Sequence, residues 1–311
     1  MENRFESKKR VFDNFHFAGV HIRRDDDGII HVNQKAHVER IKTMDKLCSF
    51  EEFRSKRHSL AWLTQSRPDV CATANILSQV TPSTFDEMHV KKLNAMIRHI
   101  HSTRDLSLRH SPLDENSLHV VGFADSSFSN NQDLSSQLGI IVVLTDATGT
   151  ANVLHYNSYK SKRVVRSVLG GETYAFADVF DVAYSIRHDL RKILQKDVKL
   201  TLLTDSMSLF KVIINSSVTT EKRLMIDISA VREAYERSDI DFIGWISSKN
   251  NIANGLTKLG VCATLVEFLE THVLDQEIRT VIDGRFQYLS LHPNLIQAKR
   301  IPRSVGFSRL E

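Results

Sequence analysis

The sequence predicts an α/β fold in which a mixed five-stranded sheet is flanked by helices and preceded by a small α+β region. Two observations support this prediction. In the second part of the chain, three strand-like segments come first, and helical and strand-like segments then alternate. Such an order is typical of a mixed sheet with helices packed on it. The first part combines a hairpin pattern with several helical patterns.

Residues 1–110 form the predicted α+β region. Residues 15–34 read as a β-hairpin whose DDDG turn contains Gly28, since such a turn needs a residue that accepts a positive φ. Helical patterns follow at 35–44, at 59–80 with an interruption near Pro68, and from Thr84 to Leu106. The last helix carries apolar residues at helical spacing, which we expect in the core: Met88, Leu93, Met96, Ile97 and Ile100.

A polar stretch with a proline, at residues 110–117, predicts a domain boundary. The predicted strands beyond it are at about 118–125, 138–145, 151–159, 199–204 and 239–246. The predicted helices are at about 167–194, 206–214, 221–237 and from Asn251 onward. We therefore expect one domain over residues 115–260, a carboxy-terminal helix and tail over 261–311, and independent folding of the segment 110–260.

The composition favours a reducing, intracellular compartment without a membrane partner. Cys48, Cys71 and Cys262 are too few and too far apart for a disulfide framework or a zinc cluster. No apolar run is long enough to span a bilayer, and the amino terminus lacks the apolar stretch of a signal peptide. The 41 basic and 37 acidic side chains leave a net charge of +4, which by itself does not indicate a nucleic-acid partner.

Three acids lie at the ends of predicted elements: Asp125 after an apolar strand, Glu172 near the start of a long helix, and Asp205 after another strand. A strand-end Asp is often a turn former or a helix cap, so each aspartate alone has a structural explanation. Glu172 differs because it continues an apolar helix face that includes Phe176 and Val179. An unpaired carboxylate there is costly, so a cation must compensate it.

Oxygen ligands of this kind suit Mg²⁺, with Mn²⁺ as a substitute, rather than zinc. Two such ions about 4 Å apart clamp the attacking water and the leaving oxygen during phosphodiester hydrolysis. The sequence offers no convincing Ser–His or Cys–His pair for covalent catalysis. It therefore predicts a two-metal site at Asp125, Glu172 and Asp205.

The segments GFADSSF, GGETYA, LLTDSMSL and NIANGLTK resemble, in this order, four motifs of the ribonuclease H domain of copia-type retrotransposon polyproteins. Upstream segments, such as RFESKKRVFDNFHFAGVHIRRDDDG, are similar to the thumb and connection of the reverse transcriptase in these polyproteins. The polymerase's Tyr-x-Asp-Asp loop is absent from the sequence. The resemblance implies a remnant of the polymerase followed by a ribonuclease H-like fold. Without the Tyr-x-Asp-Asp loop, the chain alone is not expected to synthesise DNA.

The resemblance also implies hydrolysis of the RNA strand of RNA–DNA hybrids. The expected location is the cytoplasm or the nucleus, or a virus-like particle in which the other polyprotein domains are partners. Asn254 departs from the family, which has an aspartate at this position and uses it to hold the second metal. Asn254 would be a weak fourth ligand, so impaired activity is expected. The alternative is an inactive fragment that keeps the fold and binds nucleic acid.

A basic run lies between the third predicted strand of this domain and the Glu172 helix: Lys160, Lys162, Arg163 and Arg166. Beside an acidic metal site it is expected to bind a phosphate backbone, although an isolated run is usually only a solvated hairpin. Ser126, directly after the first acid, is a candidate donor to a phosphate or to a ribose 2′-hydroxyl.

Overall fold

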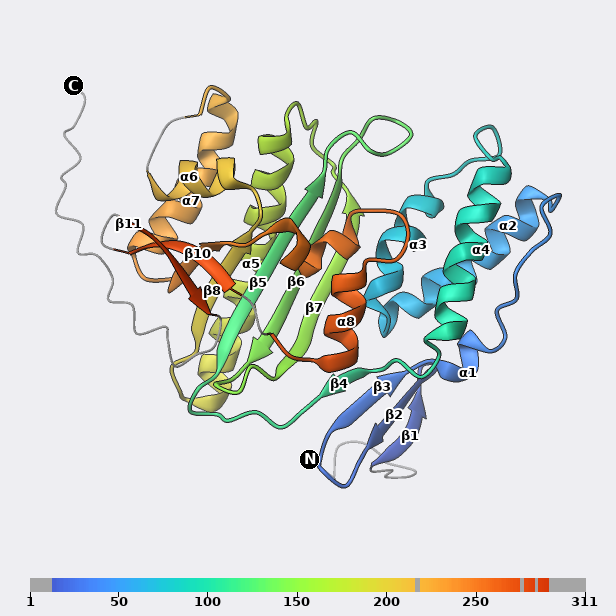
Figure 1. The fold of residues 1–311 in the computed structure, drawn as a ribbon, viewed down its shortest axis with the longest axis horizontal. Coiled ribbons are helices and arrows are strands. Elements are labelled where there is room, and N and C mark those ends of the chain that lie inside the picture. The colour runs from blue at the N-terminus through green and yellow to red at the C-terminus, as the bar shows by residue number, and fades with distance from the viewer. Residues whose placement is uncertain (1–12, 216–218, 275–276, 283–284, 291–311) are drawn as a thin grey trace, which may run out of the picture.

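The computed structural model describes residues 13–215, 219–274, 277–282 and 285–290. Within these residues, the strands form a four-stranded sheet from the first part of the chain and a seven-stranded sheet from the second (Figure 1). The predicted tail at 296–311 lies outside the described residues. Within the described residues, no helix combines the length and the apolar character that crossing a lipid bilayer requires.

The small sheet has four antiparallel strands in the order β1-β2-β3-β4. A turn with positive φ at Ala18 and Gly19 divides the first arm of the predicted hairpin into β1 and β2. Its strands are β1 (Asn14–Phe17), β2 (Val20–Arg24), β3 (Ile30–Asn33) and β4 (Leu108–His110). Gly28 has a φ of +80° in the turn before β3, as the turn prediction requires. β4 falls at the predicted domain boundary, because the chain returns there to pair with β3.

The helices of the first part are α1 (Lys35–Val38), α2 (Phe50–Trp62), α3 (Cys71–Ser78) and α4 (Glu87–Ser102), with 3₁₀ helices η1 (Leu63–Gln65) and η2 (Pro68–Val70). The interruption near Pro68 is confirmed. Met88 is 52% exposed, so its prediction as a core residue is wrong. α4 begins only at Glu87, capped by Asp86, and Val90 rather than Met88 takes the first buried position.

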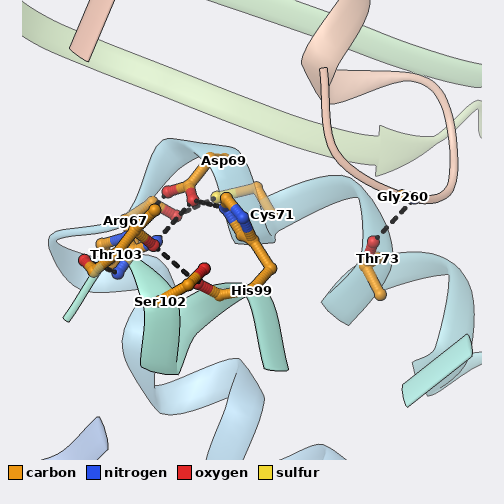
Figure 2. A network of polar contacts seen from close by, with 8 residues as sticks. All are labelled: Arg67, Asp69, Cys71, Thr73, His99, Ser102, Thr103 and Gly260. Carbon is orange, nitrogen blue, oxygen red and sulfur yellow. Dashed lines mark hydrogen bonds and ion pairs between the residues drawn. The ribbon is translucent and has the colours of Figure 1, made fainter. Parts of the chain in front are cut away.

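A buried polar network ties η2 to α4 in this region (Figure 2). Arg67 donates to both carboxylate oxygens of Asp69, at 2.9 and 2.6 Å, and His99 lies 2.8 Å from the same carboxylate. Burial alone would raise the pKa of Asp69, but the hydrogen bonds from Arg67 and His99 outweigh it and bring the pKa to about 2. Asp69 is therefore a buried anion fixed by two basic side chains.

The large sheet has the strand order β11-β10-β9-β8-β5-β6-β7. Its strands are β5 (His119–Ser127), β6 (Gln137–Thr145), β7 (Ala151–Lys160), β8 (Lys199–Thr204), β9 (Phe242–Trp245), β10 (Glu277–Ile282) and β11 (Arg285–Ser290). β5, β6 and β7 are antiparallel, whereas β8 runs parallel to β5, and β9 parallel to β8. The predicted mixed five-stranded sheet is confirmed, and the β10–β11 hairpin adds two strands at its β9 edge.

The helices of the second part are α5 (Val168–Leu194), α6 (Met207–Ile214), α7 (Met225–Glu236) and α8 (Ala263–Thr271), with 3₁₀ helices η3 (Lys222–Leu224), η4 (Ser248–Asn250) and η5 (Ile252–Leu256). α5, α6 and α7 pack on one face of the sheet and enclose the first core. η5 and α8 pack on the other face and enclose the second core. The sheet is thus covered by helices on both faces, as predicted.

The first part of the chain also lies against this second face. Cys71 and Leu108 belong to the second core. The hydroxyl of Tyr156 on β7 donates to the carbonyl oxygen of Thr64 at 2.8 Å, and the amide of Gly260 donates to Thr73 at 3.2 Å (Figure 2). The division into 1–110, 115–260 and 261–311 stays a prediction.

Candidate metal centre

The parallel pairing of β5 and β8 sets the position of two of the three acids. Ala124 lies opposite Thr204 in this pairing, so the next residues, Asp125 and Asp205, emerge at the same edge of the sheet. Glu172 reaches this edge from the second turn of α5. One carboxylate oxygen from each of the three acids lies within 4.8 Å of the other two. The structure therefore brings together the three acids that the sequence singled out.

Asp125 and Glu172 approach each other from opposite faces of the sheet. Asp125 shares its face of β5 with Phe123, which lies in the second core, and it accepts a hydrogen bond from the hydroxyl of Thr257. Ser126 points to the other face, where its hydroxyl donates to Glu172 Oε1 at 2.9 Å. The two carboxylates thus meet where β5 ends.

Burial makes these acids hard to ionise. Asp125 is 4% exposed and Glu172 is 5% exposed. Burial raises the pKa of Asp125 to about 6, although the Thr257 hydrogen bond partly opposes this. Burial, followed by repulsion from Asp125 and Asp205, raises the pKa of Glu172 to about 8. A nearby cation would reverse both effects.

Asp205 is held by the segment that follows β9. The hydroxyl of Ser248 donates to Asp205 Oδ2, and the indole nitrogen of Trp245 donates to the carbonyl oxygen of Asp205 at 2.8 Å. Asp205 itself is only half-buried. Solvent therefore reaches the cluster from the Asp205 side.

Asn254 lies in η5 and is 8% exposed. Its side-chain nitrogen donates to the carbonyl oxygen of Ser248, and its Oδ1 accepts a hydrogen bond from Lys258 Nζ at 2.7 Å. The side chain of Asn251 donates to the carbonyl oxygen of Ala124 at 2.9 Å, which joins η5 to the strand that carries Asp125. The fourth predicted position is thus close to the acids but already bonded.

Two glycines permit these close approaches. A Cβ at Gly139 on β6 would lie 2.7 Å from Leu256 Cβ and 2.8 Å from Thr257 Cγ2. A Cβ at Gly171 on α5 would lie 2.6 Å from the hydroxyl oxygen of Ser126. Glycine at these two positions therefore lets η5 approach β6 and lets α5 approach β5 this closely.

The basic run follows β7 at the same end of the sheet, but part of its charge is already compensated. Lys160 forms an ion pair with Asp133, and Arg163 Nη1 lies 2.9 Å from Asp227 Oδ2. The Arg163 guanidinium also lies 4.8 Å from the ring centre of Tyr174. Lys162 and Arg166 are exposed and form no ion pair within the described part of the chain. These two are the better candidates for contacting a phosphate.

The hydroxyl of Ser126 is engaged as well. Its hydrogen is directed to Glu172 rather than to the surface. A substrate role for Ser126 requires that this bond be exchanged, so the role stays a prediction.

Sequence reasoning missed Thr257, Lys258 and Ser248. Thr257 and Lys258 lie three and four residues after Asn254, within the same NIANGLTK segment, and the spacing of one helical turn was an available signal. Ser248 carried no comparable signal, because its bond to Asp205 depends on the path of the chain after β9.

The residues present fit a hard divalent cation. The three side chains offer only oxygen ligands, as Mg²⁺ and Mn²⁺ prefer. In addition, Glu172 Oε2 is buried and accepts no hydrogen bond from the part of the chain that the structure describes. A buried carboxylate oxygen without a partner is costly, and a bound cation would provide that partner.

No protein-family model and no curated protein sequence matches the chain. Solved structures match about half of it. RNase H1 from the halophilic archaeon Halobacterium salinarum NRC-1 is 16% identical, with a TM-score of 0.32, over 48% of this chain and 98% of that one. LC11-RNase H1, isolated from compost by a metagenomic approach, is 18% identical, with a TM-score of 0.35, over 48% of this chain and 99% of that one.

A foamy viral protease–reverse transcriptase in complex with an RNA/DNA hybrid is 15% identical, with a TM-score of 0.29. That match covers 48% of this chain and 20% of the viral chain. These structural neighbours are ribonuclease H domains, alone or within a longer viral protein.

Proposed function

We propose that this chain is a ribonuclease H-like protein that hydrolyses the RNA strand of RNA–DNA hybrids with the help of divalent ions. Asp125, Glu172 and Asp205 are the proposed metal ligands and catalytic residues, with Asn254 as a weak fourth ligand. The proposal extends to the origin of the chain, as the carboxy-terminal part of a copia-type retroelement polyprotein, which the motif resemblance supports.

One observation carries the proposal: the three carboxylates, far apart in the sequence, lie within 4.8 Å of one another, and a buried oxygen of Glu172 has no partner among the described residues. Three carboxylates at this distance repel one another unless a cation neutralises them. The raised pKa of Glu172, about 8, expresses this unrelieved repulsion together with burial.

Divalent cations held by Asp125, Glu172 and Asp205 would supply an activated water and would stabilise the leaving 3′-oxygen, which would give products with a 5′-phosphate and a 3′-hydroxyl. The role of the protein's own side chains is to hold and orient the three carboxylates. Thr257 fixes the Asp125 carboxylate, Ser126 fixes that of Glu172, and Ser248 fixes that of Asp205. Lys162 and Arg166, which are exposed after β7, are the proposed contacts to the phosphate backbone of the hybrid.

The test measures cleavage of a labelled RNA–DNA hybrid by the full chain in Mg²⁺ and in Mn²⁺. We expect slow cleavage by the wild type, faster cleavage by Asn254→Asp, and none by Asp125→Asn. Equal cleavage by Asp125→Asn and the wild type would overturn the assigned site.

A second candidate function is hybrid binding without cleavage. The observation that favours it is that Asn254 Oδ1, the only ligand atom at the fourth position, already accepts a hydrogen bond from Lys258. If every variant, including Asn254→Asp, binds the hybrid but cuts nothing in either metal, this second function replaces the first.

A further inference from the structure

Lys258 places an ammonium group where the centre lacks its fourth acid. Lys258 Nζ donates to Asn254 Oδ1 at 2.7 Å, while the nitrogen of the same amide donates to the carbonyl oxygen of Ser248. Reversing the amide would set its NH₂ against the ammonium and its oxygen against the Ser248 carbonyl. The amide orientation is therefore fixed, and its only ligand atom faces Lys258.

The ammonium also acts on the acids. Thr257, the residue before Lys258, donates its hydroxyl to Asp125, and the same hydroxyl oxygen lies 3.2 Å from the carbonyl oxygen of Asn254. The positive charge of Lys258 stabilises the charged form of Asp125. Asp125, Asn254 and Lys258 thus belong to one electrostatic unit.

The charges in this unit favour a single divalent ion. Three carboxylates and one ammonium leave two negative charges, which one divalent ion balances. If Asn254 Oδ1 were to ligate a second ion, it would have to share that oxygen with the ammonium. Lys258 is exposed, but its ammonium is held at the amide of the buried Asn254, so a second cation at the same oxygen would meet a like charge.

We propose that Lys258 takes the electrostatic place of a second metal ion, so that this centre holds one tightly bound divalent ion instead of two. This inference rests on the proposed metal centre. The cation at the position of Asn254 is then the ammonium group of Lys258 and not a metal ion.

The test counts Mn²⁺ ions bound to the full chain by calorimetry and by electron paramagnetic resonance, with Mn²⁺ as the only ligand. We expect one ion in the wild type. In Lys258→Met the first ion should bind roughly tenfold more tightly, because about 1.4 kcal/mol of repulsion is a factor of ten. A second ion should bind weakly in Asn254→Asp, whose carboxylate competes with Lys258 for it, and more tightly in Asn254→Asp with Lys258→Met.

Three controls accompany these variants. Lys258→Arg keeps the charge and should bind one ion like the wild type, and Lys249→Met removes an exposed lysine outside this unit and should change nothing. Glu172→Gln should weaken or abolish Mn²⁺ binding. Thermal unfolding of each variant confirms that it is folded.

The outcomes separate the two proposals. Two ions in the wild type, or unchanged affinity in Lys258→Met, would overturn the role of Lys258 and leave the metal centre standing. No Mn²⁺ binding by the folded wild type would overturn both.

Discussion

Thr257 donates its hydroxyl to the carboxylate of Asp125 across 132 residues of sequence, and both side chains are buried. The bond joins the 3₁₀ segment after β9 to the first strand of the large sheet. It fixes one of the three proposed metal ligands before any ion binds. The geometry of the centre therefore depends on a residue that does not itself bind the metal.

Replacing Thr257 by Val should lower the free energy of unfolding by about 1–3 kcal/mol at pH 8, because a buried charged acceptor loses its donor. The loss should be smaller at pH 5, where Asp125, with a pKa of about 6, is mostly protonated. Urea unfolding at both pH values measures the change. Thr257→Ser, which keeps the hydroxyl, is the matched control; if it is as unstable as Thr257→Val, packing rather than the hydrogen bond is responsible.

The stability that Glu172 contributes to the metal-free protein should fall as the pH rises. The pKa of Glu172 is raised from 4.5 to about 8 on folding, so the folded state holds a proton that the unfolded state has lost between these values. The stabilisation is complete below pH 4.5 and disappears as the pH rises to about 8. Asp125 contributes in the same direction between pH 3.8 and about 6.

Thermal unfolding in a chelator at pH 6 and at pH 8 measures this effect. Glu172→Gln should flatten the dependence in that window, since the amide does not titrate. Added Mn²⁺ should stabilise the wild type most at pH 8, where its ligands give up their protons most readily. The same dependence on pH in chelator for the wild type and for Glu172→Gln would contradict the assignment.

Gly139→Ala should destabilise the protein by about 1–3 kcal/mol, because the added methyl has no free space. Its Cβ would lie 3.1 Å from the carbonyl oxygen of Ala253, besides its close contacts with Leu256 and Thr257, so η5 must move away from β6. Gly170→Ala is the control, because there the nearest atom is 3.3 Å away and the residue lies within a helix. Denaturant unfolding compares them; equal losses would show that the tight packing of η5 is not the cause.

Hybrid binding should depend on Lys162 and Arg166 more than on Arg163. Each lost phosphate contact lowers the slope of log affinity against log salt by about 1. We expect this decrease for Lys162→Ala and for Arg166→Ala, but a smaller one for Arg163→Ala, because Arg163 is paired with Asp227. The measurement is a salt titration of hybrid binding by the full chain. An unchanged slope of log affinity against log salt in both Lys162→Ala and Arg166→Ala would remove the basic run from the interface.

The sequence was sufficient to predict the sheet and the meeting of the acids. In the strands from β5 to β9, apolar residues either alternate with polar ones or form a continuous run, and turn residues separate the strands. Helix α5 has a long apolar face. These local patterns and their order along the chain determined the architecture. Asp125 and Asp205 could be paired because both lie at the ends of predicted strands, although in the structure β5 continues past Asp125 to Ser127.

The parts that the sequence did not reveal depend on contacts between distant segments. The engagement of Asn254 by Lys258 and Ser248 depends on an amide orientation that only three-dimensional neighbours decide. The neutralisation of Arg163 by Asp227 joins a loop to a helix 64 residues away. Met88 was misassigned because it precedes Leu93 by five residues and Ile97 by nine, which places it roughly on the opposite side of the helix from the buried face, whereas Val90 lies on that face.

Both flanks of the predicted 115–260 unit contribute side chains to the second core. Leu265, Phe268 and Leu269 of α8 are buried there, and Cys71 of α3 packs beside them. A recombinant fragment cut at the predicted limits would leave apolar surface on β6 and β7 open to water, and such surface promotes aggregation. Recombinant fragments for biochemical work should therefore begin before Thr64 and extend past Leu274, so that loss of activity in a shorter fragment is not mistaken for a defect in chemistry.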